Sequence, residues 1–241
     1  MKKWKTRVIL IFSGITFLIT FTLLLVIQCS DGGDMSRYKK DISGRTAGLM
    51  DEAENNIDWE KLQDVNPDVY AWLSVPGTNI DYPVLESKTE SRDFYLHHDI
   101  YKKFNFAGSI YSRRENNINF TDAVTVLYGH NMRNGSMFAD IKKFEDKAFF
   151  DKHNRIIIYL PDSTLLYQVV SIYHTDDKDI LSRVQNIEEY KKEILCPGNG
   201  QARKGLSKVD GRILTLSTCA GEEKERRVLQ SVLAKEIKLE K

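Results

Sequence analysis

The chain contains many short apolar runs with a two-residue period, and these runs constrain its fold more than any other feature. Such runs are typical of half-buried strands, and they occupy residues 69–75, 78–85, 107–111, 123–128, 155–160, 165–173, 212–219 and 227–239. Pro-Gly at 76–77 and Pro-Asp-Ser-Thr at 161–164 provide turns between neighbouring runs. Roughly eight short strands with few helices predict a single mainly β domain, either a barrel or a sandwich.

Three helical segments accompany the predicted strands. Asp58 is a candidate N-cap for a short helix over residues 58–65. Residues 136–144 place apolar side chains on one face of a helix. Residues 187–195 begin with a capping-box pattern, and this helix precedes the strand that ends at Cys219.

The N-terminal stretch has the pattern of a membrane anchor. Residues 1–7 are basic, and residues 8–27 form an uncharged run dominated by Ile, Leu, Phe and Val. A helix of about 20 such residues spans a hydrocarbon core of roughly 30 Å. A cleaved signal peptide needs a shorter apolar run and an Ala-x-Ala-like site, which this stretch lacks. We therefore interpret residues 1–28 as a basic flank and transmembrane anchor, with the N-terminus cytoplasmic and the remainder outside the cell.

The rest of the chain divides into a stalk and one folded domain. Residues 29–56 are polar and weakly periodic, which favours a stalk or N-terminal helical segment, and residues 57–241 hold the domain. A net charge of +1 gives no indication of a nucleic-acid partner. Three cysteines are too few for a disulfide scaffold, and no Cys/His cluster has metal-ligand spacing. The sequence therefore predicts neither a metal nor a cofactor.

Cys219 and His130 both stand at the end of a predicted strand. Cys219 closes the run 212–219 before a polar loop, where a thiol can meet solvent and substrate. Of the five histidines, His130 alone follows directly on an apolar strand and a glycine, Gly129. Two such strand ends can meet at one end of a barrel, as nucleophilic catalysis requires. The alternatives are a small buried cysteine and a structural histidine.

An arginine pair follows Cys219 after one acidic loop. Arg226 and Arg227 begin the next predicted strand, which the short loop makes a hairpin neighbour of the cysteine strand. A guanidinium near the thiol could stabilise an oxyanion, and alternation lets only one of the pair face it. The alternative is a solvated pair that balances the acidic loop.

Together these motifs resemble the sortases, membrane-anchored cysteine transpeptidases of Gram-positive bacteria. Thr-Leu-Ser-Thr-Cys at 215–219, Leu-Tyr-Gly-His-Asn-Met at 127–132 and Arg-Arg-Val-Leu at 226–229 are similar to the cysteine, histidine and arginine motifs of the family. The segments that are similar to class B members in particular lie at residues 58–62, 66–73, 76–84 and 95–99.

The resemblance implies a fold and a catalytic set. The fold is a closed eight-stranded β-barrel with N-terminal helices and a helix before the catalytic cysteine strand. Cys219 is the nucleophile, His130 the general acid/base and Arg226 the oxyanion stabiliser. Arg226 is chosen over Arg227 because the family pattern has a small residue five positions after the arginine, here Ser231. The positions that match the peptide groove of class B enzymes are Leu96, Tyr128, Ser217 and Thr218.

The implied reaction is transpeptidation at the cell surface. A class B sortase cleaves a C-terminal sorting signal of the Asn-Pro-x-Thr-Asn kind after Thr, through a thioester on the cysteine. An amine of the cell-wall peptide or its lipid-linked precursor then accepts the protein. Arg92 stands where an asparagine can occur, and Ala220 where an acidic residue often follows the cysteine. Two alternatives remain: a thiol peptidase that only hydrolyses, and a non-catalytic membrane-anchored β-domain that binds peptides.

Overall fold

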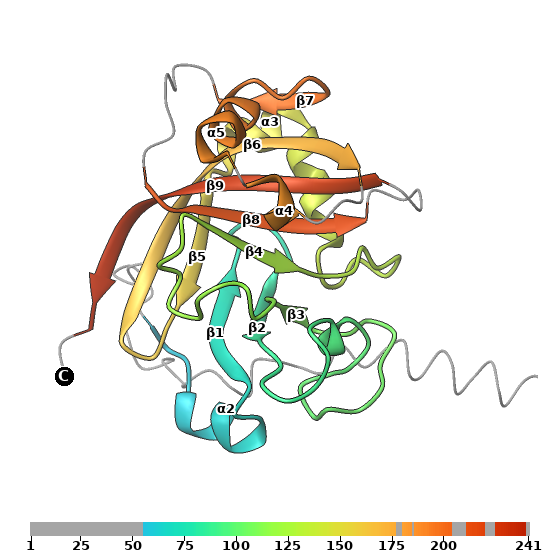
Figure 1. Cartoon of the computed structure of the whole chain (residues 1–241), viewed down its shortest axis with the longest axis vertical. Coiled ribbons are helices and arrows are strands. Elements are labelled where there is room, and N and C mark those ends of the chain that lie inside the picture. The colour runs from blue at the N-terminus through green and yellow to red at the C-terminus, as the bar shows by residue number, and fades with distance from the viewer. Residues whose placement is uncertain (1–54, 177–179, 185, 204–210, 220–224, 240–241) are drawn as a thin grey trace, which may run out of the picture. The chain divides into compact units, whose positions relative to one another are not determined.

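A computed structural model describes residues 55–176, 180–184, 186–203, 211–219 and 225–239 (Figure 1). Nine strands form one sheet. The strands are β1 (Val69–Ser74), β2 (Asp81–Leu85), β3 (Ile110–Tyr111), β4 (Val124–Tyr128), β5 (Arg155–Tyr159), β6 (Ser163–Asp176), β7 (Gly200–Ala202), β8 (Ile213–Cys219) and β9 (Glu225–Lys238). The helical segments are α2 (Trp59–Val65), η2 (Phe94–Leu96), η3 (Ala139–Glu145), α3 (Lys147–Lys152), α4 (Ile180–Arg183) and α5 (Ile187–Leu195).

The sheet closes on itself into a barrel. The strand order is β5-β1-β2-β3-β4-β8-β9-β6-β7, and an additional pairing of β5 with β6 joins the two sides. Among the strands of the described residues, β7 pairs with β6 alone, so it lies outside the closed ring of eight. Closure leaves no free edge among those eight strands, which a sandwich of the same strands would not achieve. The expectation of a closed eight-stranded barrel is therefore confirmed.

Alternation along the strands builds the barrel core. Leu214 and Leu216 of β8 and Leu229 of β9 point into the main apolar cluster and are fully buried. Residues of the opposite parity face outward and meet the helices. Tyr190 and Ile194 of α5 pack on this outer face, as the apolar pattern of residues 187–195 predicts. The two-residue period thus produces two covered faces of one sheet.

A buried polar network beneath α5 supports the strands that carry the site. Thr215 Oγ1 of β8 donates to Gln230 Oε1 of β9 at 2.7 Å. Gln230 Nε2 donates in turn to the hydroxyls of Tyr190 at 2.9 Å and Tyr173 at 3.1 Å. Since buried amides need partners, this network opposes a slip in the β8–β9 register.

Two predicted helices have the expected caps. Asp58 Oδ1 accepts a hydrogen bond from Lys61 N at 3.2 Å, and α2 ends at Val65, with Asn66 as the C-cap before a proline. Asn186 Oδ1 accepts from Glu189 N at 3.2 Å at the start of α5. Side-chain oxygens thus satisfy backbone donors that the first turn leaves unpaired.

The segment 136–144 differs from its prediction. It is a 3₁₀ helix that begins only at Ala139, because Met137 has a left-handed φ of 56° that breaks helical geometry. Met137 bridges to Asn131, and its amide donates to the Tyr82 hydroxyl at 3.2 Å. The turn therefore braces the loop that follows His130, which an α-helix from residue 136 would not do.

The predicted anchor lies outside the described residues, and so do residues 29–54 of the predicted stalk. Within the described ranges, no helix has both the length and the apolar character that crossing a membrane requires. The N-terminal helices expected before residue 55 belong to the same undescribed stretch, and α2 is the helix that precedes the barrel in the described part.

Candidate active site

Parallel pairing of β4 with β8 brings two strand ends together. Tyr128 lies opposite Ser217, so His130 and Cys219, each two residues further on, leave the sheet at the same level. The pairing continues one step beyond β4, where Gly129 N donates to Ser217 O at 3.2 Å. Asn131 Nδ2 then donates to Cys219 O at 3.1 Å, which ties the histidine loop to the end of the cysteine strand. The expected meeting of the two strand ends is observed.

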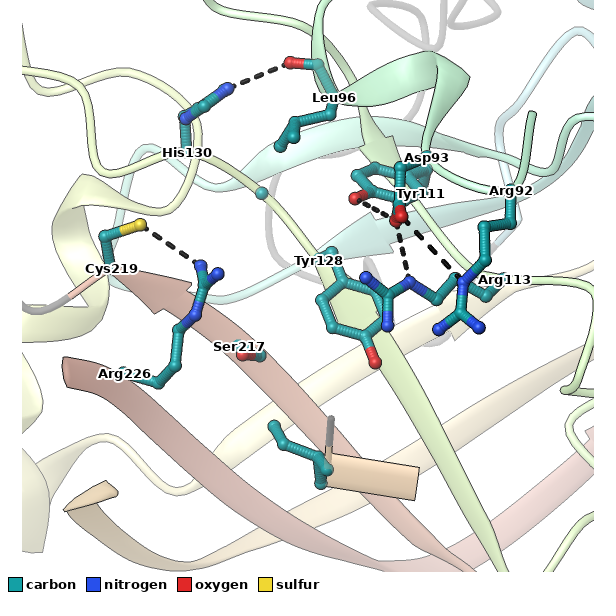
Figure 2. A pocket seen from close by; sticks show the side chains of 12 residues that line it. Arg92, Asp93, Leu96, Tyr111, Arg113, Tyr128, His130, Ser217, Cys219 and Arg226 are labelled. Atoms are coloured by element: carbon teal, nitrogen blue, oxygen red, sulfur yellow. Dashed lines mark hydrogen bonds and ion pairs between the residues drawn. The ribbon is translucent and has the colours of Figure 1, made fainter. Parts of the chain in front are cut away.

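The hairpin of β8 and β9 places Arg226 beside the thiol. Cys219 pairs directly with Arg226, and Arg226 Nη1 donates to Cys219 Sγ at 3.1 Å (Figure 2). Both side chains project from the outer face of the barrel, because residues paired across an antiparallel ladder share a face.

Arg227 points to the opposite face. Its Nε donates to Glu145 Oε1, and its side chain is buried, unlike that of a solvated surface residue. Burial alone would raise the pKa of Glu145, but hydrogen bonds from Arg227 and His174 outweigh it and lower that pKa. Arg227 therefore joins β9 to η3 and takes no part in the Cys219 contact.

His130 is oriented by a backbone carbonyl. Its Nε2 lies 2.9 Å from Leu96 O. Because a carbonyl oxygen only accepts, Nε2 carries a hydrogen in both protonation states, and Nδ1 is the atom that gains or loses a proton. Burial lowers the pKa of His130, the Leu96 carbonyl opposes this, and His97 and Arg226 lower it further. The imidazole is thus more often neutral near pH 7 than a free histidine.

We expect His130 to titrate with a midpoint below its ordinary value of about 6.5. Proton NMR of the imidazole in a Cys219→Ala background, where no thiol titrates beside it, measures this midpoint. Replacing His97 by Gln removes one repelling neighbour and should raise it. Between the lowered pKa of folded His130 and about 6.5, the unfolded chain binds more protons at this residue than the folded chain does. The contribution of His130 to the free energy of unfolding therefore rises with pH in that window. A midpoint at or above 6.5 contradicts the assignment.

A pocket of about 360 Å³ contains the three reactive groups. Cys219, His130 and Arg226 lie on one side of it, and a polar cluster lies on the other (Figure 2). The remaining lining residues are Arg92, Asp93, Leu96, Tyr111, Arg113, Tyr128, Gly129, Ile180 and Ser217. Of the four residues predicted to bind substrate, Leu96, Tyr128 and Ser217 thus line the pocket.

The structure does not bring Thr218 into the pocket. Alternation directs Ser217 and Cys219 outward, so the side chain between them points to the opposite face of the sheet and is fully buried. Its Oγ1 has no hydrogen-bond partner among the described residues. Thr218 is thus the one predicted groove residue that the structure does not place in the pocket lining, because three consecutive strand residues, Ser217 to Cys219, cannot all face the same side.

Thr218→Val should therefore leave peptide cleavage nearly unchanged. Valine has the same shape and removes a buried hydroxyl, so we expect unfolding free energy to stay level or to rise by about 1 kcal/mol. Steady-state kinetics and denaturant unfolding test the two parts. Ser217→Val, on the pocket side, is the matched comparison and should impair peptide binding. A large loss of turnover in Thr218→Val alone would place its hydroxyl in substrate recognition.

The far side of the pocket holds a polar cluster that carries no signal in the sequence. Tyr111 OH donates to Asp93 Oδ1 at 3.0 Å, and Arg113 Nε donates to the same oxygen at 2.7 Å. The Arg113 guanidinium also lies over the Tyr128 ring, 4.5 Å from its centre. Arg92 forms ion pairs with Asp93 and Glu115. These residues come from separate segments, so no spacing rule links them.

Two of the other histidines are engaged away from the pocket. His153 stacks on Phe149, with ring centres 4.1 Å apart, and His174 lies between Glu145 and Glu225. Within the described part of the chain, no group of three or more His, Cys, Asp or Glu side chains is placed to share a metal ion.

Comparison with known proteins places this site in a family. A family model described as Sortase domain matches residues 73–234. The chain belongs to the sortase family. Sortase B of Listeria monocytogenes is 34% identical to it over 214 residues, which cover 81% of this chain and 80% of that protein. Sortase B of Staphylococcus aureus is 28% identical over 251 residues, and this match covers 99% of each of the two chains.

Solved structures agree with the sequence relatives. The X-ray structure of Clostridium perfringens sortase B is similar with a TM-score of 0.65 at 37% identity, and the match covers 73% of this chain and 99% of that one. These similarities confirm the class B resemblance read from the motifs. This sortase is a cysteine transpeptidase of the cell wall, and its substrates are proteins with sorting signals that it transfers to an amine nucleophile.

Proposed function

We propose that this sortase cleaves a sorting signal of the Asn-Pro-x-Thr-Asn kind, or a related one, after Thr and transfers the protein to an amine of the cell-wall peptide. Cys219 is the nucleophile, Arg226 the oxyanion stabiliser and His130 the general acid/base. The observation that carries these roles is the 3.1 Å contact of Arg226 Nη1 with Cys219 Sγ, beside His130 in one pocket.

In the first half-reaction, the Cys219 thiolate attacks the carbonyl carbon of Thr and forms a C–S bond. The Arg226 guanidinium lies 3.1 Å from the sulfur. It is therefore within reach of the oxygen on the carbonyl carbon that the sulfur attacks. Arg226 thus stabilises negative charge on that oxygen. The C–N bond breaks, the leaving amine takes the Nδ1 proton of the His130 imidazolium, and a thioester remains.

In the second half-reaction, the acceptor amine attacks the thioester carbon. The oxyanion forms again in reach of Arg226, and Nδ1 of the neutral His130 accepts the proton that the amine loses. The C–S bond breaks, and Cys219 leaves as a thiolate. The products are a new amide and the pair of Cys219 thiolate and His130 imidazolium with which the cycle began. Because burial lowers the pKa of His130, this pair is populated less near pH 7 than it would be for a free histidine.

The pocket suggests how the signal peptide lies. Leu96 and Ser217 line the pocket near Cys219. Tyr128 lies between Cys219 and the polar cluster around Asp93 (Figure 2). A peptide with Thr at Cys219 would extend its preceding residues over Tyr128 toward Arg92. The preferred first residue of the signal then depends on the hydrogen-bonding groups of Arg92 and Asp93.

We also propose that residues 1–28 anchor the enzyme in the cell membrane, that residues 29–56 are the stalk and that residues 57–241 are the catalytic domain outside the cell. The run of uncharged residues at 8–27, flanked by basic residues, supports this topology. An anchored domain would act where secreted substrates and lipid-linked cell-wall precursors emerge.

A fluorogenic sorting peptide, assayed with and without a cell-wall amine acceptor, tests the proposed function. We expect a transfer product that forms only with the acceptor and that mass spectrometry identifies. Cleavage without transfer at saturating acceptor would favour the thiol peptidase. No cleavage across a panel that varies the first signal residue would favour the non-catalytic peptide-binding domain.

A further inference from the structure

We propose that Gly108 and Tyr95 are positioning residues for His130, acting through the carbonyl group of Leu96. Residues 93–109 form a segment that we call the Leu96 loop. The proposal rests on the function of His130 proposed above. It explains how His130, two residues after β4, is oriented by a loop remote from it in sequence.

Gly108 packs closely against the Leu96 carbonyl group. A Cβ added at Gly108 would lie 2.3 Å from Leu96 O and 2.6 Å from Tyr95 O, distances at which backbone atoms must move. Ser109 N donates to Tyr95 O at 2.9 Å, which fastens the two parts of the loop together. Gly108 also has a φ of +57°. Only glycine therefore allows the Leu96 oxygen to remain where His130 Nε2 meets it.

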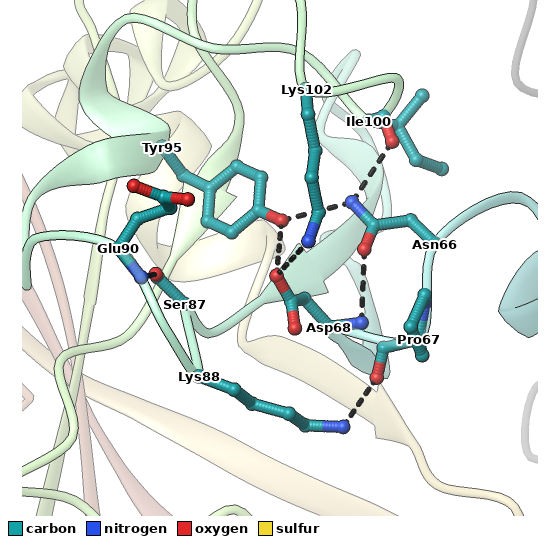
Figure 3. A network of polar contacts seen from close by, with 9 residues as sticks. All are labelled: Asn66, Pro67, Asp68, Ser87, Lys88, Glu90, Tyr95, Ile100 and Lys102. Atoms are coloured by element: carbon teal, nitrogen blue, oxygen red, sulfur yellow. Dashed lines mark hydrogen bonds and ion pairs between the residues drawn. The ribbon is translucent and has the colours of Figure 1, made fainter.

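A buried polar network holds the same loop at its other side (Figure 3). Tyr95 OH donates to Asp68 Oδ2 at 2.7 Å and accepts from Asn66 Nδ2 at 2.9 Å. Lys102 Nζ pairs with the same Asp68 oxygen at 2.9 Å. Asn66 Nδ2 also donates to Ile100 O at 2.9 Å. The loop is thus fastened to the turn between α2 and β1, which leads directly into the barrel.

Tyr95 precedes Leu96 directly, so its anchored side chain limits movement of the Leu96 carbonyl. The charged or titratable groups that face His130 are His97 of this loop, Cys219 of β8 and Arg226 of β9. Both His97 and Arg226 disfavour the imidazolium, and the Leu96 carbonyl is the contact that favours it. Displacing that carbonyl should lower the His130 pKa and release Nε2 from its fixed tautomer.

Nitrogen-15 NMR of the histidine side chains in the full-length chain, held in detergent micelles, tests the proposal without requiring turnover. In the wild type we expect neutral His130 to carry its hydrogen on Nε2. In Gly108→Ala we expect a mixture of tautomers and a lower titration midpoint. We also expect kcat to fall by about tenfold to a hundredfold, with KM much less affected.

Gly211→Ala is the matched control for backbone strain. Gly211 has a φ of +101°, but a Cβ there would meet atoms no closer than 3.6 Å. The control should therefore lose stability without altering the His130 signals. Unchanged His130 tautomer and midpoint in folded Gly108→Ala, or equal changes in Gly211→Ala, would overturn the proposal.

If Gly108→Ala does not fold, Tyr95→Phe tests whether the Leu96 loop positions His130. This variant removes one hydroxyl from the network around Asp68. Tyr70→Phe is its control, because it removes a buried hydroxyl outside that network, one that donates to Ser112 Oγ at 2.8 Å. We expect the His130 midpoint to fall in Tyr95→Phe alone. Equal midpoints in the two variants would overturn the positioning role. A shifted midpoint with full turnover would support positioning but contradict the proposed acid/base role of His130.

Discussion

We expect Cys219→Ala to abolish both cleavage and transfer of a sorting peptide, and Cys196→Ala to leave both unchanged. Alanine cannot form the thioester, and among the described residues no other thiol lies in the pocket. We expect a loss of more than about 10⁴-fold in kcat/KM, as for other enzymes that lose their nucleophile. A fluorogenic peptide measures the loss, and mass spectrometry of the quenched wild type should show the acyl group on Cys219.

Cys196 is the appropriate control because it is also a free thiol and is exposed at the C-terminal end of α5. A change in Cys196→Ala would show that removing any thiol disturbs the protein. Cleavage that persists in Cys219→Ala would contradict the nucleophile assignment and, with it, the thioester mechanism.

We expect Arg226→Ala to lower kcat far more than Arg227→Ala does, although the two residues are neighbours. Removing one donor from an oxyanion site costs about 10² to 10³ in kcat, and Arg226 is the guanidinium within 3.1 Å of Cys219 Sγ. KM should change little, because the lost interaction belongs mainly to the transition state. Arg226→Lys, which keeps the charge but not the planar fork, should retain only part of the rate.

Arg227→Ala should instead affect stability. It removes a buried guanidinium that bonds to the partly exposed Glu145, so we expect a loss of about 1–2 kcal/mol in unfolding free energy with kcat within a few-fold of wild type. Steady-state kinetics and denaturant unfolding of both variants measure the two effects. The reverse pattern, with the rate lost in Arg227→Ala, would show that the oxyanion arginine has been assigned wrongly.

The active site depends on the order of strands around the barrel. His130 reaches the site from β4 and Arg226 from β9, and both of these strands flank β8. Cys219 at the end of β8 therefore has the His130 imidazole on one side and the Arg226 guanidinium on the other.

The sequence by itself determined the elements that depend on local periodicity and capping. The two-residue period located the eight strands of the barrel but not the short strand β7, and Asp58 and Asn186 located the starts of α2 and α5. It also determined that Cys219 and His130 end their strands, because a run of apolar residues stops in the chain where the strand leaves the core.

Only the tertiary structure decided what each side chain at the site contacts. Register placed Arg226 on the Cys219 face and Arg227 against Glu145, and alternation turned Thr218 away from the pocket. The Leu96 carbonyl that orients His130 and the cluster around Asp93 come from segments far away in the chain. Periodicity acts between neighbours along the chain, whereas these contacts depend on how barrel closure and loop packing place distant backbone segments together.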